Sequence, residues 1–267
     1  CGAVLDGDRV AGVLLESRSG REAVMARALV DCTGYGDLAA HAGAAFHEPN
    51  DHPVANSIGL GGVNVEEYLA FFERHGALRE HAIGRRSGQD GKTVRVHASG
   101  SKLPEEFRRE AAAIGMAPVT TTVHDDYFMF IKLNVRMPVS PTSRDAVAEA
   151  ELELRRRQER AVQLFRRHVP GCSKAFMART SPSLCIRRGR VIACDLDLGR
   201  NDVLDGRHFA DDIMAYGFHD SAPRLQIRGG GTYGVPYRAL LVSGRRNLFA
   251  AGMLITSDFD AHMSTRN

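Results

Sequence analysis

The stretch Asn247-Leu-Phe-Ala-Ala-Gly-Met253 decides the fold of this chain. The apolar run from Leu248 to Ala251 predicts a buried strand, and Gly252 ends it. Glycine has no side chain, so another backbone or a ligand can approach closely at that point. The strand lies between Tyr233-Gly-Val-Pro-Tyr-Arg-Ala-Leu-Leu241 and Asp260-Ala-His-Met-Ser-Thr-Arg-Asn267. This arrangement is typical of a cofactor site.

A second informative stretch is Ala28-Leu-Val-Asp-Cys-Thr-Gly-Tyr-Gly-Asp-Leu-Ala-Ala-His-Ala-Gly-Ala44. It predicts a strand, a glycine turn and a new helix whose exposed amides Asp37 can cap. Taken alone, the residues fit either a cofactor-binding turn or an ordinary strand, turn and capped helix.

A third set of segments lies between these two stretches and comprises Val169-Pro-Gly171, Ile186-Arg-Arg-Gly-Arg-Val-Ile192 and Asn201-Asp-Val-Leu204. In this order the segments resemble bacterial FAD-dependent oxidoreductases of the glutathione-reductase-like class. The family pattern includes Ile-Asp-Ala-Thr-Gly-Asp-Gly-Asp-Leu-Ala-Ala, Val-Arg-Glu-Ser-Arg-Arg-Ile, Tyr-Gly-Ile-Pro-Tyr-Arg-Ala-Leu, Asn-Leu-Leu-Val-Ala-Gly-Arg and Ala-His-Gly-Ser-Thr-Arg. The resemblance covers nearly the whole chain and is loosest between residues 46 and 130.

The resemblance implies an FAD site and an active site beside it. The cofactor-binding residues that it implies are Thr33, Gly34, Gly36, Asp37, Ala251 and Gly252. The catalytic residues that it implies are Arg187, Arg190, His262 and Arg266. The chain departs from the family at Arg188-Gly189, at Met253 and at Phe259, which bears on the substrate chemistry.

Each catalytic candidate has a structural alternative. Arg187 and Arg190 can hold a substrate carboxylate or offset charge on reduced flavin, or they can be buried arginines paired with Asp195 or Asp197. His262, whose ordinary pKa of about 6.5 suits proton exchange, can instead be a helix-start histidine bonded to backbone.

The predicted fold is α/β: part of a Rossmann-like FAD-binding domain with a β-meander, interrupted by an α+β substrate domain. Residues 1–45 and 185–267 are assigned to the FAD domain, and residues 46–184 to the inserted domain. Strands are expected at 3–5, 10–16, 23–30, 119–123 and 128–135. Helices are expected at 65–74 and 104–114, and a long helix is expected to start after Thr142 and Ser143, either of which can cap it, and to end before Pro170. A loop rich in glycine and charged residues is expected at 84–101.

The chain contains no Gly-x-Gly-x-x-Gly that follows a strand and opens a helix. That turn normally holds the pyrophosphate of a dinucleotide at a helix N-terminus. Since the chain begins with Cys1 and ends directly after Arg266, we interpret it as an internal fragment whose missing upstream part carries the turn. We expect the fragment alone to bind FAD weakly or not at all and to be inactive.

Composition sets further limits on function. The 267 residues are 43% apolar and 25% charged, with a net charge of +3, which is ordinary usage for a globular protein. Arginines on the predicted long helix alternate with glutamates, which favours an ion-paired face over a nucleic-acid surface. No stretch approaches the roughly 20 apolar residues that cross a membrane. Five cysteines without a Cys-x-x-Cys pair favour a reduced, cytoplasmic protein.

A metal site is not expected. His41, His47, His52, Glu48 and Asp51 lie near one another in sequence, but their spacing fits no compact ligand set. The function that the sequence predicts is therefore transfer of hydride or electrons between a small organic substrate and FAD. The alternative is a fragment or binding module of the same fold that does not hold FAD. The oligomeric state is left open.

Overall fold

The computed structural model describes residues 2–85, 88–116, 118–124, 128–217, 227–255 and 258–266. The chain divides into two compact units. The first contains Cys1–His52, Val139–Thr142 and Arg187–Asn267, and the second contains Pro53–Pro138 and Ser143–Ile186. The assignment of the FAD domain to the two ends of the chain stays a prediction.

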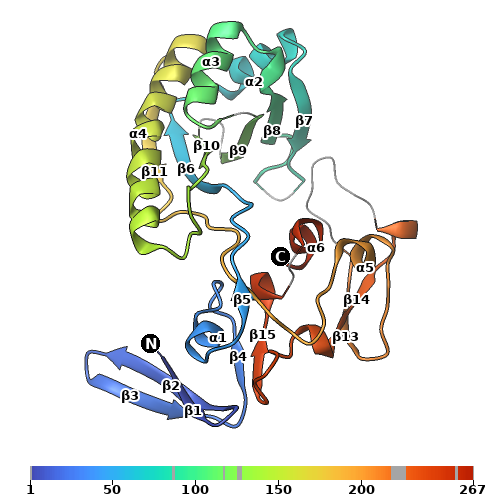
Figure 1. The fold of residues 1–267 in the computed structure, drawn as a ribbon. Helices are drawn as coiled ribbons and strands as arrows, with labels where there is room; N and C mark the ends of the chain where they lie inside the picture. The colour runs from blue at the N-terminus through green and yellow to red at the C-terminus, as the bar shows by residue number, and fades with distance from the viewer. Residues whose placement is uncertain are drawn as a thin grey trace. The chain divides into compact units, whose positions relative to one another are not determined.

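The first unit mixes short strands with short helices (Figure 1). Its strands are β1 (Gly2–Asp6), β2 (Arg9–Ser17), β3 (Gly20–Met25), β4 (Leu29–Asp31), β5 (Phe46–His47), β12 (Val191–Ile192), β13 (Asp212–Tyr216), β14 (Tyr233–Pro236) and β15 (Leu248–Ala250). Its α-helices are α1 (Asp37–His41), α5 (Arg200–Leu204) and α6 (Phe259–Thr265), and 3-10 turns lie at Arg228–Gly230, Tyr237–Ala239 and Gly252–Leu254.

The predicted β-meander is present at the start of the chain. Strands β1, β2 and β3 form an antiparallel three-stranded sheet. Gly7 in the first turn and Gly20, the first residue of β3 after the second turn, both have positive φ, where glycine is favoured. The expected third strand at 23–30 is wrong in one respect, because β3 ends at Met25 and a separate strand, β4, begins at Leu29.

Strand β4 leaves the meander and pairs with β15 from the other end of the chain. The two strands are parallel, which is the pairing expected of a cofactor-binding α/β domain. Leu29, Leu248 and Ala250 belong to a core that also contains Tyr233 and Leu254. The first unit therefore has its own hydrophobic core, and β15 lies in it as predicted.

The second unit is a six-stranded antiparallel sheet with helices (Figure 1). Its strands, in spatial order, are β11 (Phe176–Thr180), β6 (Val54–Gly61), β10 (Phe128–Val135), β9 (Pro118–His124), β8 (Thr93–Ser99) and β7 (Leu78–Ile83). Its helices are α2 (Val65–Arg74), α3 (Glu105–Ala113) and α4 (Arg144–His168), with a 3-10 turn at Gly100–Lys102.

Local sequence explains why these helices begin where they do. The Asn64 side chain accepts from Glu67 N at 3.1 Å and caps α2. Ser143 caps α4 in the same way, accepting from Ala146 N at 3.4 Å. Each cap satisfies an amide that would otherwise lack a partner at the first turn. The apolar stripe predicted for α4 faces the core, where Phe165 is fully buried.

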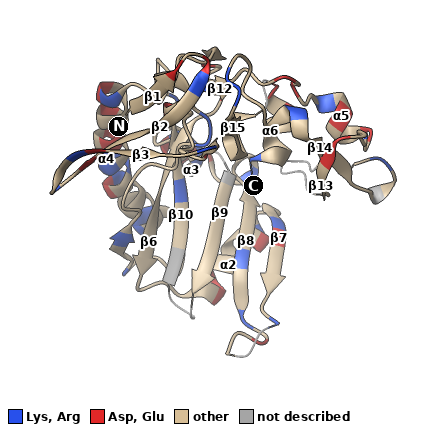
Figure 2. Cartoon of the chain, turned by 90° about the horizontal axis from the view of Figure 1, so that it is seen from below, with Lys and Arg blue, Asp and Glu red and all other residues tan. Residues whose placement is uncertain are grey.

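The polar face of α4 carries both signs of charge (Figure 2). Arg155 pairs with Glu151 at 2.5 Å, and Arg157 pairs with Glu153 at 2.7 Å. Such pairs four residues apart are neighbours on a helix surface. The arginines at 155–157 thus form ion pairs with glutamates of the same helix.

Two further expectations about secondary structure are wrong. The region 84–101, expected to be a loop, contains β8, and β7 precedes it. Asp37 does not cap α1, because Gly36 occupies the cap position and Asp37 is the first helical residue. Its backbone N donates to the Thr33 hydroxyl at 2.9 Å instead.

Membrane-spanning helices and clusters of metal ligands are both absent from the described residues. No helix there is both long enough and apolar enough to pass through a lipid bilayer. No three His, Cys, Asp or Glu side chains within the same ranges gather closely enough to hold a metal ion.

Candidate cofactor and active site

The carboxyl ends of β4 and β15 lie side by side. Leu29 is opposite Leu248, and Asp31 is opposite Ala250. The pairing continues past β15, because Ala251 N donates to Asp31 O at 3.1 Å. Ligands of α/β sheets bind outside the carboxyl ends of parallel strands. The two turns that follow these strands, residues 32–36 and 251–255, are therefore called the cofactor edge below.

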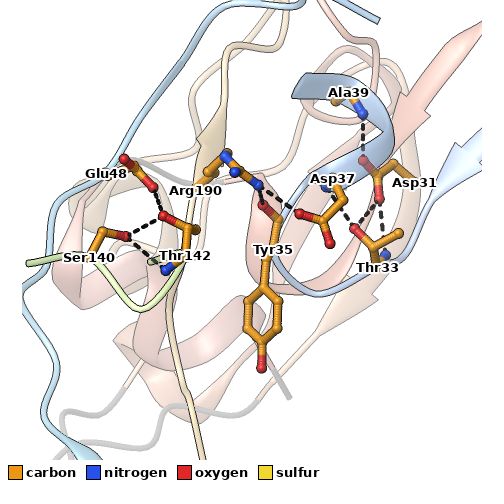
Figure 3. A network of polar contacts seen from close by, with 9 residues as sticks. All are labelled: Asp31, Thr33, Tyr35, Asp37, Ala39, Glu48, Ser140, Thr142 and Arg190. Atoms are coloured by element: carbon orange, nitrogen blue, oxygen red, sulfur yellow. Dashed lines mark hydrogen bonds and ion pairs between the residues drawn. The ribbon is translucent and has the colours of Figure 1, made fainter. Parts of the chain in front are cut away.

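A buried carboxylate organises the first of these turns (Figure 3). Asp31 is 1% exposed, and its Oδ1 accepts from both the backbone N and the hydroxyl of Thr33, at 2.9 and 2.7 Å. Its Oδ2 accepts from Ala39 N at 2.8 Å. Charge-assisted bonds of this kind are roughly twice as strong as neutral ones. Sequence reasoning missed Asp31, although an aspartate at the end of a buried strand was a usable signal.

The glycines of the cofactor edge serve different purposes. Gly36 has a φ of +67°, and a Cβ there would lie 2.6 Å from Ile192 Cδ1, so it is needed for packing. A Cβ on Gly34 would lie 3.4 Å from Met253 Cε, which places the two turns against each other. Gly252 has a φ of +74°, and among the described residues no atom beyond its chain neighbours lies within 4 Å of where its Cβ would stand.

Arg190 is engaged with the first turn of the cofactor edge (Figure 3). Its Nη1 donates to Tyr35 O at 3.0 Å and to Asp37 Oδ1 at 2.7 Å. The pairing expected for a structural arginine was with Asp195 or Asp197, and the structure shows Asp37 instead. In this conformation, Arg190 and Asp37 both stabilise the turn.

Arg187 differs from Arg190 in its surroundings. It is half-buried, and in the described ranges its guanidinium makes no hydrogen bond or ion pair. Its backbone carbonyl accepts from His262 Nε2 at 3.0 Å. The structure thus joins His262 to the backbone of Arg187.

His262 lies fully buried in α6. Burial, followed by the charge of Arg188 and by His52, lowers the pKa of His262 to about 3. The ring is therefore neutral near pH 7, with its proton on Nε2, where the Arg187 carbonyl accepts it. The pKa thus lies well below the ordinary value of about 6.5 on which the prediction of proton exchange rests. The bond to backbone matches the structural alternative.

A buried polar cluster adjoins His262, and sequence reasoning missed its role. Arg188 is 3% exposed, and its Nη1 donates to Asp51 Oδ2 at 2.6 Å. Asp51 Oδ1 bonds His52 Nδ1 at 2.7 Å. The His52 ring stacks on the Phe259 ring with 4.5 Å between the ring centroids, and it lies edge-on to the His262 ring with 5.1 Å between the centroids. The departure from the family at Arg188 is thus a buried ion pair.

Arg266, the fourth catalytic candidate, ends α6. Its backbone N donates to His262 O at 3.2 Å, and the residue is half-buried. Its positive charge is one of the causes that lower the pKa values of His52 and His262. Arg266 therefore contributes to the field around the buried histidines.

Comparison with protein families shows to which family the chain belongs. A family model described as FAD dependent oxidoreductase matches residues 1–267. The chain belongs to the FAD-dependent oxidoreductase family. Comparisons with curated proteins and with solved structures found no match. The cofactor of this oxidoreductase is therefore FAD.

The cofactor edge fits one side of an FAD site. Thr33, Gly34, Ala251 and Gly252 present backbone at the carboxyl ends of two parallel strands, and Gly252 leaves room for close approach. FAD supplies the hydride or electron transfer, while the protein binds, orients and tunes it. In the oxidoreductase these four residues would hold the cofactor, whereas Gly36 and Asp37 shape the turn.

We expect acid to destabilise the oxidoreductase through His262. Its ring has a pKa of about 6.5 in the unfolded chain and about 3 in the folded protein. Between pH 6.5 and pH 3 the His262 ring is protonated in the unfolded chain but not in the folded protein. The contribution of His262 to the free energy of unfolding is therefore complete above about pH 6.5 and decreases as the pH falls below it. At pH 5 the loss is about 2 kcal/mol.

Urea unfolding at pH 7 and pH 5 measures this loss. His262→Asn should show a smaller loss on acidification than the unmodified protein, by about 2 kcal/mol. The control is His41→Asn, because His41 is exposed. Equal losses in the unmodified protein and in His262→Asn would show that His262 is not the acid-sensitive group.

Proposed function

We propose that this protein transfers hydride or electrons between a small organic substrate and FAD, with the flavin seated at the cofactor edge. The observation that supports the proposal most is the open backbone at Gly252, beside two parallel strand ends. Residues 1–45 and 185–267 would form the FAD domain, and residues 46–184 the substrate domain. The protein would act in the bacterial cytoplasm on a small-molecule substrate, without a nucleic-acid or membrane partner.

Arg187 is the group that we assign to the reacting centre. Its guanidinium is a permanent cation with no ion pair or hydrogen bond in the part of the chain that the structure describes. The Arg187 carbonyl accepts a hydrogen bond from His262 in α6. Strand β12 follows Arg187 within five residues along the chain and packs against the turn at Gly252–Leu254. A cation held there can bind a substrate carboxylate or offset negative charge on reduced flavin.

His262 has a supporting role in this proposal. A neutral, fully buried ring bonded to the Arg187 carbonyl cannot supply a proton near pH 7. It fixes the backbone of Arg187 against α6. Arg190 fixes the same segment against residues 35–37. The segment that carries Arg187 is thus held at both sides.

Replacing Arg187 by alanine, in the longer FAD-binding protein that the sequence predicts, tests the proposal without knowledge of the substrate. We expect the two-electron reduction potential of bound FAD to fall by roughly 30 to 60 mV, since one charged interaction with the reduced form is lost. Reduction by small carboxylic acids should slow about tenfold or more, and FAD should stay bound.

The matched control is Arg21→Ala, which removes an exposed arginine paired with Glu16. This control corrects for the loss of one positive charge from the whole protein. An Arg187→Ala protein with an unchanged potential and unchanged reduction rates would remove Arg187 from the reacting centre.

A further inference from the structure

Asp51 joins three segments that are distant in sequence. Its Oδ2 accepts from Arg188 Nη1 at 2.6 Å, across 137 positions. Its Oδ1 bonds the Nδ1 of the neighbouring His52 at 2.7 Å. The other ring nitrogen of His52 lies 3.4 Å from Met263 Sδ, and its ring face stacks on Phe259 in the same helix. Asp51 thus connects the loop at 51–52, the segment at 187–188 and helix α6.

The chemistry of the cluster requires a carboxylate at this position. Both of its neighbours donate: Arg188 is a cation without acceptor atoms, and His52 Nδ1 faces the other oxygen. A carboxylate accepts on both oxygens and also neutralises the arginine. The arginine side chain is only 1% exposed, so replacing Asp51 removes one of the negative charges that stabilise a buried cation. An amide at position 51 could accept one of these bonds only.

We propose that Asp51 is a positioning residue for the active site, acting through Arg188 and His52. Arg188 follows Arg187 directly, so the ion pair fixes the backbone from which the Arg187 side chain projects. His52 lies edge-on to His262 at 5.1 Å, and His262 holds the Arg187 carbonyl. The two routes from Asp51 therefore converge on the same peptide. This role rests on the proposed function of Arg187.

If Asp51 acts by positioning Arg187, replacing Asp51 has no effect on the flavin once Arg187 has been removed. A double-mutant cycle on the reduction potential of bound FAD measures this. Asp51→Asn should lower the potential in the same direction as Arg187→Ala. The double variant should have the potential of Arg187→Ala alone, whereas two independent effects would add.

A second readout does not depend on flavin. Ring N–H signals of ¹⁵N-histidine report the hydrogen bond from His262 to the Arg187 carbonyl. In Asp51→Asn, exchange of the His262 Nε2 proton with solvent should accelerate about tenfold or more, because the segment at 187–188 has lost the ion pair with Asp51. Asp51→Glu keeps both acceptors and should restore most of the protection.

The control is Asp8→Asn. Asp8 also accepts from an arginine, Arg246, at 2.7 Å, but both side chains are exposed. It should change neither the potential nor the exchange of the His262 proton. An additive double variant, or unchanged His262 exchange in Asp51→Asn, would overturn the positioning role. An Arg187→Ala protein with normal potential would instead defeat the proposed function, and the exchange measurement would still decide the role of Asp51.

Discussion

Replacing Gly252 by alanine should weaken FAD binding about 10- to 100-fold. The backbone φ at Gly252 is +74°, and no atom of the described residues beyond its chain neighbours lies within 4 Å of the position of a Cβ there. If the cofactor approaches there, a methyl group occupies space that the ligand needs, at a cost of roughly 1–3 kcal/mol. Titration of the apoprotein with FAD, followed by flavin fluorescence, measures the change.

Gly244 provides a closely matched control. Its φ is +75°, it is exposed like Gly252, and a Cβ there would also have no neighbour within 4 Å in the part of the chain that the structure describes. Alanine should cost both sites a similar strain of about 1–2 kcal/mol in stability. FAD affinity should fall only for Gly252→Ala. Equal affinities of the two variants would mean that the cofactor does not approach Gly252.

Replacing Asp31 by asparagine should lower the free energy of unfolding by about 2–4 kcal/mol. The two oxygens of this buried side chain accept three hydrogen bonds, from Thr33 N, Thr33 Oγ1 and Ala39 N. An asparagine places its NH₂ group against at least one of these donors, which leaves buried polar groups unpaired. The turn at Thr33 should loosen, and FAD should bind more weakly.

Urea denaturation compares this variant with Asp205→Asn. Asp205 is exposed and pairs with Arg228, so its loss should cost less than about 1 kcal/mol. In titrations with FAD, Asp31→Asn should also lose more affinity than Asp205→Asn. A stability loss at Asp31 no greater than that at Asp205 would contradict the role given to the buried carboxylate.

Elements with strong local signals could be predicted from the sequence. Helix α2 has the expected bounds, Val65–Arg74, because an asparagine cap precedes an amphipathic run. Strand β15 was recognisable from its apolar run before a glycine. Strand β7 was missed because Arg79, Glu80 and His81 break the apolar alternation that normally identifies a strand. Strand β8 does alternate, with Val94, Val96 and Ala98 as its apolar positions, but it lies in a stretch rich in glycine and charged residues.

The candidate site was predictable only in part, since its contacts are between distant segments. The family-like motifs brought Arg187 and His262 to attention, and the structure joins them through one backbone hydrogen bond. No local pattern pairs Asp51 with Arg188, which lies 137 positions away. The shift in the pKa of His262 depends on burial and on that neighbouring arginine, so it too required the structure.

Hydrogen–deuterium exchange with and without FAD tests most directly whether the cofactor binds at the carboxyl ends of β4 and β15. We predict that FAD slows exchange at residues 32–39 and 248–255 and leaves the β7–β8 hairpin of the second unit unchanged. Protection confined to the second unit, with none at the ends of β4 and β15, would contradict the placement of the FAD site.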